Sequence, residues 1–193
     1  HVYATSEEAK ADGLYILGEN GIDKTYFGAG DVKFADNGDR EINKADMQVI
    51  GDPNPDIYGN IFTSLSYKRI RLDVNFNYSL GNDAYNYLRS QLESGNRFMN
   101  QSVAMVNRWS YEGQVTDMPT VMWEDPMGNA RFSDRWIEDA SYLRLKSITL
   151  SYELPLNSTF IHGLTFWGQA NNVFTVSKYL GADPDFSMSN SVL

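Results

Sequence analysis

The sequence predicts an all-β chain made of strands and long extracellular loops of a large antiparallel transmembrane β-barrel, present as a fragment with both ends missing. Two observations favour this fold class. One segment alternates apolar and polar residues over about ten positions, which is the length that a strand needs to cross a bilayer. Short and long connections also alternate between the predicted strands, as they do in outer-membrane barrels. The chain begins at His1 and ends just after a stretch rich in Gly, Asp, Pro, Ser and Asn. Neither end resembles a domain terminus, so we expect a fragment.

Composition excludes several classes of function. The 193 residues carry 16 Lys and Arg against 25 Asp and Glu, for a formal net charge of −9, and no Cys. Nucleic-acid binding depends on clustered Lys and Arg, so we expect no nucleic-acid partner. The absence of Cys removes disulfides and thiolate metal sites. No run of apolar residues approaches the length of a membrane-spanning helix.

The first predicted elements are an acidic, turn-rich extracellular loop at 18–56 and a transmembrane hairpin at 57–79. In the hairpin, strands at 57–67 and 69–79 meet at a tight turn formed by Lys68 and Arg69. One face of the second strand is apolar, and it consists of Ile70, Leu72, Val74, Phe76 and Tyr78. The other face is polar, and it consists of Arg71, Asp73, Asn75, Asn77 and Ser79. A half-buried strand of a soluble sheet shows the same alternation, usually over five or six residues, so that alternative stays open.

The next predicted element is a long extracellular loop at 80–140. Within it, residues 96–109 have helical spacing and predict a surface helix. The loop is rich in aromatic residues, four of which are candidates to face a substrate: Trp109, Tyr111, Trp123 and Trp136. Such rings either supply a small core for the loop or stack on sugar rings and peptide side chains. The sequence does not decide between these two roles.

A second transmembrane hairpin is predicted at 141–174, followed by an extracellular loop at 175–193. Its strands span about 141–154 and 164–174, joined by a short connection that begins at Pro155. Strict alternation places Arg144 and Lys146 on the same face as Ile148, so both are expected at or above the outer membrane interface. A charge on the lipid face near the bilayer midplane costs about 2–4 kcal/mol for Arg or Lys.

The acidic loop contains a candidate calcium site. Residues 35–46 resemble an EF-hand loop, in which side-chain and backbone oxygens at fixed positions surround the ion. With Ile42 at position 8, the candidate ligands are Asn37, Asp39, Glu41 and Asp46. Two positions depart from the pattern, since Ala35 has no side-chain oxygen and Arg40 stands where Gly makes a sharp turn. A turn that satisfies its own backbone is the alternative.

The sequence gives little support for a catalytic site. The chain has two histidines, no Gly-x-Ser-x-Gly motif and no phosphate-binding glycine-rich loop. Adjacent acidic pairs such as Glu138-Asp139 are common on surfaces and do not by themselves indicate a glycosidase. We therefore expect a protein that is not an enzyme and that requires no cofactor, with calcium as the one candidate ion.

Several segments together resemble the SusC/RagA family of TonB-linked outer-membrane transporters. The most specific are the Ser-Tyr-Leu-Arg-Leu-Lys run from Ser141 to Lys146 and the Tyr-Leu-Gly-Ala-Asp-Pro run from Tyr179 to Pro184. The other segments are residues 30–34, 50–55, 66–68, 107–109, 131–140, 147–152 and 169–174, together with Lys178 and Asp185, which flank the second run. Their order resembles the C-terminal fifth of that family.

The resemblance implies a barrel of about 22 strands in the outer membrane of a Gram-negative, Bacteroidota-type bacterium. It implies TonB-driven import of glycan or peptide fragments, with a SusD-like surface lipoprotein as partner and with outer-membrane lipid around the barrel. The TonB contact would belong to an absent N-terminal region. Two alternatives stay open: a soluble all-β carbohydrate-binding module with an aromatic sugar platform, and a small free-standing barrel.

Overall fold

The computed structural model describes residues 1–156, 160–161 and 163–185 of the chain. The chain divides into two compact units. We call them the strand unit, made of Gly51–Tyr85 and Ile137–Leu193, and the loop unit, made of His1–Ile50 and Asn86–Trp136. Each unit is built from two separate stretches of sequence, so neither is a local excursion of the chain.

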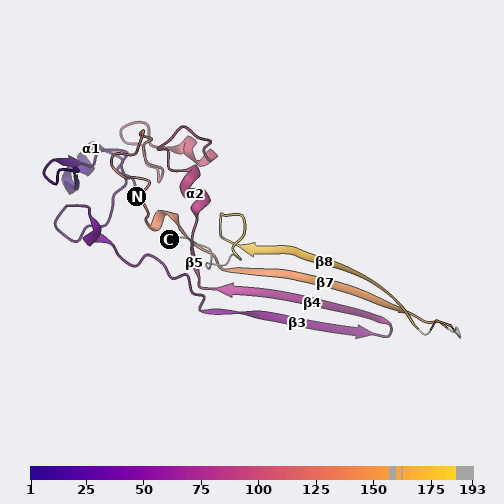
Figure 1. Ribbon diagram of the computed structural model, residues 1–193. Helices are drawn as coiled ribbons and strands as arrows, with labels where there is room; N and C mark the ends of the chain where they lie inside the picture. The colour runs from indigo at the N-terminus through magenta and orange to yellow at the C-terminus, as the bar shows by residue number, and fades with distance from the viewer. Residues whose placement is uncertain (157–159, 162, 186–193) are drawn as a thin grey trace. The chain divides into compact units, whose positions relative to one another are not determined.

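The strand unit is dominated by a four-stranded antiparallel sheet (Figure 1). Its order is β3-β4-β7-β8, and its strands span β3 Ile57–Tyr67, β4 Ile70–Leu80, β7 Tyr142–Leu154 and β8 Leu164–Ser177. A small two-stranded sheet pairs β5 (Asp83–Tyr85) with β6 (Ile137–Asp139). The four long strands lie within three residues of the predicted bounds, and each has the length that crosses a bilayer.

The β3–β4 hairpin has the predicted two-residue turn. Tyr67 pairs with Ile70, which leaves Lys68 and Arg69 as the turn. Lys68 has φ 55°, in the left-handed region that such turns require and that Gly or Asn usually occupies. The register then runs without interruption from Tyr67 to Ile57, so every residue keeps its predicted face.

The two faces of the four-stranded sheet differ sharply in charge. The strands contain five charged residues, and the register places four of them on the face of Asn60 and Asn77: Arg71, Asp73, Arg144 and Glu153. The fifth, Lys146, sits at a break in the register. The opposite face bears large apolar side chains that are more than half exposed, such as Leu65, Leu150 and Phe166. An exposed apolar surface of this extent marks a lipid or protein contact.

A β-bulge at Lys146 corrects one prediction. Leu145 pairs with Phe76 and Ser147 pairs with Asn75, so Lys146 is an extra residue between them. The bulge shifts the alternation, and Arg144 consequently pairs with Asn77 on the polar face. The expectation that Arg144 shares the face of Ile148 was wrong, because strict alternation assumes an unbroken ladder.

The loop unit contains short elements only. They are α1 (Ser6–Asp12), β1 (Tyr15–Leu17), β2 (Lys24–Tyr26), η1 (Lys44–Asp46), α2 (Tyr87–Leu92), η2 (Val103–Asn107) and η3 (Asp134–Trp136). None of the helices in the described part of the chain has the length and apolar character that a membrane crossing needs.

The surface helix predicted at 96–109 is wrong in extent. Only Val103–Asn107 is helical, as a 3₁₀ turn capped by Ser102. The carbonyl of Asn96 instead accepts a hydrogen bond from the backbone N–H of Glu124. A tertiary contact has therefore taken a carbonyl that a helix would need. The unpredicted helix α2 begins earlier, at a cap made by the Asn86 side chain.

The core of the loop unit gathers residues far apart in the sequence. It consists of Tyr3, Ala9, Leu14, Phe27, Ile42 and Met127, with Ile16 and Phe34 packed against it. Helix α1 supplies Ala9 and is closed by Thr5, whose hydroxyl accepts from Glu8 N–H, and by Gly13 at φ 64°. Ile42 anchors the acidic loop to this core.

Candidate functional site

The polar face of the sheet carries a ladder of asparagines across β3 and β4. The Asn60 side-chain amide nitrogen donates to the side-chain oxygen Oδ1 of Asn77 at 2.5 Å and also to Oδ1 of Asn75. The three residues lie on one face because Asn60 pairs directly with Asn77, two positions from Asn75 on the same strand. Amides keep both donors and acceptors available, so this surface can bind hydroxyl and peptide groups alike.

The cations on this face are mostly paired. Arg71 Nε contacts the two Asp73 carboxylate oxygens at 2.9 and 3.1 Å. Arg144 donates to Thr175 Oγ1 at 3.0 Å and to Asp185 Oδ2 at 3.2 Å, and it also bonds to Asp183. The Arg144 side chain is 10% exposed. These ion pairs tie the segment after β8 to β7.

Asp183 is held ionised by this contact. Partial burial raises the pKa of Asp183, but the Asp185 N–H and the Arg144 guanidinium outweigh burial and bring the pKa below its ordinary value. The Arg144 guanidinium also lies over the ring of Tyr142, with Cζ 5.3 Å from the ring centroid.

A shallow groove lies at the end of the polar face near the start of β7. It is lined by Pro55, Tyr58, Gly59, Asn60, Asn75, Asn77, Tyr78, Ser79, Tyr142 and Lys146. The lining comes from β3, β4 and β7 and from the segment before β3. The register places Tyr58, Asn60, Asn75, Asn77, Ser79 and Tyr142 on the polar face, and Lys146 joins this lining from the break in the register.

The four aromatic candidates have different environments. Trp136 is fully buried, so its prediction as a substrate-facing ring was wrong. Trp109 is half-buried, donates from Nε1 to the Ala4 carbonyl at 3.2 Å and packs so closely on Gly30 that a Cβ there would lie 2.6 Å from its Cε3. Trp123 and Tyr111 are 58% and 65% exposed. Both remain candidates to face a substrate.

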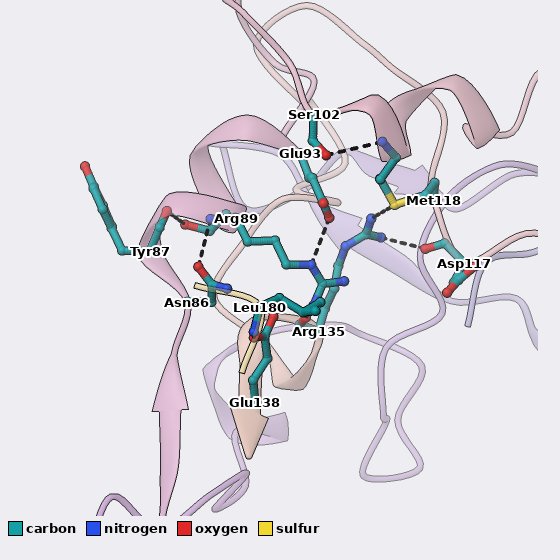
Figure 2. Close-up of polar contacts among 12 residues, drawn as sticks. Asn86, Tyr87, Arg89, Glu93, Ser102, Asp117, Met118, Arg135, Glu138 and Leu180 are labelled. Atoms are coloured by element: carbon teal, nitrogen blue, oxygen red, sulfur yellow. Dashed lines mark hydrogen bonds and ion pairs between the residues drawn. The ribbon is translucent and has the colours of Figure 1, made fainter. Parts of the chain in front are cut away.

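The buried Trp136 ring packs against two arginines, Arg89 and Arg135, whose polar contacts are drawn in Figure 2. The guanidinium carbons of Arg135 and Arg89 lie 4.9 and 5.8 Å from its ring centroid. Arg89 Nε binds Glu93 at 3.0 Å and its Nη1 donates to the Arg135 carbonyl, while Arg135 donates to the Asp117 carbonyl. Burial lowers the pKa of Arg135 from its usual value. The cluster fastens α2 to η3.

The predicted calcium ligands lie in one compact loop. The carboxylates of Asp36, Asp39 and Asp46 come within 4.8 Å of one another. Three hard anionic oxygens at this separation fit the chemistry of calcium. Of the four predicted ligands, Asp39 and Asp46 are in this group, and the third carboxylate comes from Asp36, the residue after Ala35.

The same oxygens already serve the backbone. Asp46 accepts from the N–H groups of Asn37 and Asn43, and Asn37 accepts from that of Asp39. Glu41 accepts instead from the Asn43 side chain at 3.0 Å. Arg40 adopts φ 66°, the left-handed conformation for which Gly is usual. The fold of the loop is thus compatible with a bound ion, and calcium remains a prediction.

Sequence reasoning missed the groove residues Asn60, Tyr142 and Lys146 and the exposed ring of Phe98, which contacts Trp123 at a centroid distance of 5.0 Å. A lysine in the middle of a membrane-length strand was a usable signal. It conflicts with strict alternation, and a bulge resolves the conflict.

Comparison with known proteins places these features in a family. No family model matches the chain. The chain is 34% identical over 161 residues to the TonB-dependent receptor P3 of Formosa agariphila, across 81% of the chain. It is 28% identical to the TonB-dependent receptor SusC of Bacteroides thetaiotaomicron, across 77% of the chain. The chain spans only 16% and 15% of the lengths of these two relatives.

A solved structure matches the chain as well. The RagAB peptide importer in its open-open state matches 89% of the chain with a TM-score of 0.65 and 28% identity, over 18% of the matched chain. The chain belongs to the SusC/RagA family of TonB-dependent receptors. The four long strands are therefore a section of a TonB-dependent receptor barrel, and the fold predicted from the sequence is confirmed.

Proposed function

We propose that the chain forms part of an outer-membrane importer that takes up glycan or peptide fragments. In this proposal TonB drives uptake, and a SusD-like surface lipoprotein works with the receptor. The observation that carries it is the two-faced sheet, in which charged and amide side chains share one face while the other bears exposed apolar side chains.

The physical argument concerns what each face would contact. A barrel strand turns alternate residues toward lipid and toward a polar interior. Exposed Leu, Ile and Phe side chains gain about 25 cal/mol per Å² when lipid removes them from water. Arg71 and Arg144, by contrast, would keep water or polar protein groups around them. One sheet therefore supplies both a membrane contact and a wall for solutes.

The relatives support the same proposal. Two are TonB-dependent receptors, and the matched structure is a peptide importer. Since the chain spans a small part of each, the transport activity, the substrate, the lipoprotein partner and the outer-membrane location are proposals for this protein. We propose no chemical step, because an importer binds and releases its cargo unchanged.

An uptake experiment tests the proposal. Cells that express the full-length receptor and its neighbouring lipoprotein would be given fluorescent oligopeptides and oligosaccharides. We expect accumulation that stops when the receptor gene is deleted, when TonB is deleted, or when the proton-motive force is collapsed. The receptor should fractionate with the outer membrane.

Two results would contradict it. A receptor recovered as a detergent-free soluble monomer that binds sugars would favour the carbohydrate-binding module instead. Uptake that is unaffected by loss of TonB would favour a passive barrel. Deletion of the lipoprotein gene alone then tests the partner separately from the receptor.

A further inference from the structure

The groove on the polar face is a candidate binding site in its own right. Apart from Pro55 and Gly59, its lining side chains are polar or aromatic, and they come from three strands that the register holds at fixed positions. Sites placed on strands hold their groups more accurately than sites on loops. The asparagine ladder at its floor is cross-linked, because Asn60 bonds to both Asn75 and Asn77.

Lys146 enters this groove because of the bulge. It is the extra residue between Leu145 and Ser147, and it lines the groove together with Asn75 and Asn77. Bulges re-aim a side chain that regular pairing would send elsewhere. Without the extra residue, strict alternation would put position 146 on the apolar face with Ile148.

The charge of Lys146 has no partner among the described residues. Of the other cations on the four long strands, Arg71 is paired with Asp73, and Arg144 is paired with Asp183 and Asp185. Lys146 makes no ion pair within the described part of the chain. Glu153 lies seven residues further along β7, roughly 23 Å away at about 3.3 Å per residue.

We propose that this groove binds a carboxylate group of the solute, with Lys146 as the cation that recognises it. Tyr58, which is 75% exposed, and the asparagine amides would bind the hydroxyl or peptide groups next to the carboxylate. The inference rests on the proposed function, since it places the groove on the solute side of the barrel. An ammonium group accepts a carboxylate from either of two sources, a peptide C-terminus or an acidic sugar.

The test measures equilibrium binding to the full-length receptor purified in detergent, by calorimetry at low salt. Two probe pairs separate the sources: N-acetyl-tetraalanine against its C-terminal amide, and trigalacturonate against its methyl ester. We expect one charged probe to bind about tenfold more tightly than its neutral form, the effect of one charge-assisted contact. The pair that shows the preference identifies the source.

Variants assign that preference to Lys146. In Lys146→Gln the preference should fall to about twofold or less, and Lys146→Arg should keep it. Asn75→Asp, which places a competing carboxylate beside Lys146, should also abolish it. Lys178→Gln removes the same charge from a residue outside the groove and should leave the preference intact.

No preference for either charged probe in the unmodified receptor would overturn the proposal, and so would a preference that survives Lys146→Gln or is lost in Lys146→Arg. Binding to the purified receptor needs neither TonB nor an energised membrane. Absence of the binding preference would therefore not contradict TonB-driven uptake, and absence of uptake would not contradict binding of a carboxylate in the groove.

Discussion

The strand unit and the loop unit are stabilised in opposite ways. In the strand unit, one face of the sheet is polar and the other is exposed and apolar, and the ladder hydrogen bonds link neighbours at regular intervals. In the loop unit, a core joins Tyr3, Ile42 and Met127, and single buried side chains such as Trp136 fasten short elements. Periodic structure distributes its stability along the strands, whereas irregular structure concentrates it in a few contacts.

The largest expected effect is at Trp136. We expect Trp136→Ala to destabilise the loop unit by about 3–5 kcal/mol, since it removes a fully buried indole, its hydrogen bond to the Arg131 carbonyl and the surface on which two arginines pack. Hydrogen exchange of the full-length receptor should show faster exchange across residues 86–136.

Trp123→Ala is the matched control for that experiment. Trp123 is 58% exposed, so its loss should change exchange much less. Equal effects of the two substitutions would contradict the view that the stability of the loop unit is concentrated in its buried side chains.

The next effect concerns the two faces of the sheet. Ile148→Arg places a cation on the apolar face, and near the bilayer midplane this should cost about 2–4 kcal/mol of folding into lipid. Thr149→Arg, on the next residue, points to the polar face opposite Asp73 and should cost far less. Refolding of the full-length receptor into vesicles, followed by denaturant titration, measures both. If the two variants refold equally well, the apolar face does not contact lipid.

The acidic loop offers a smaller test. If calcium binds, its addition should slow hydrogen exchange at residues 36–46, because the ion adds bonds to three carboxylates that lie within 4.8 Å. Asp39→Asn, which removes one charge, should weaken calcium binding about tenfold or more. If hydrogen exchange at these residues is identical in excess calcium and in excess chelator, the loop does not bind calcium and is a turn that satisfies its own backbone.

The smallest effect is expected from acidification. The folded pKa of Asp183 lies below its ordinary value of 3.8, so its ion pair with Arg144 stabilises the segment after β8 at any pH above that value. The contribution is lost as the pH falls through the lowered folded pKa. Protection of residues 178–185 should therefore persist down to pH 4 and decline below it. In Asp183→Asn the decline should be weaker.

The sequence predicted most of the sheet because its physics is local. Alternation between Ile70 and Ser79 needs only neighbouring residues to specify the face of each side chain, and the two-residue turn at Lys68 fixes the register. The loop unit was less predictable. Helix α2 is six residues long, and the stretch at 96–102 is held by a bond from Glu124 that no local pattern could reveal.

The sequence by itself determined the strands, their two faces, the acidic loop and the family, since each depends on residue order or short-range periodicity. The tertiary structure decided which aromatic rings are buried, since Trp136 and Trp123 lie in the same predicted loop and yet one is buried and the other exposed. It also decided the face of Arg144 and the exposure of Lys146 in a groove. A bulge is a property of how two strands pair, and one strand alone does not specify it.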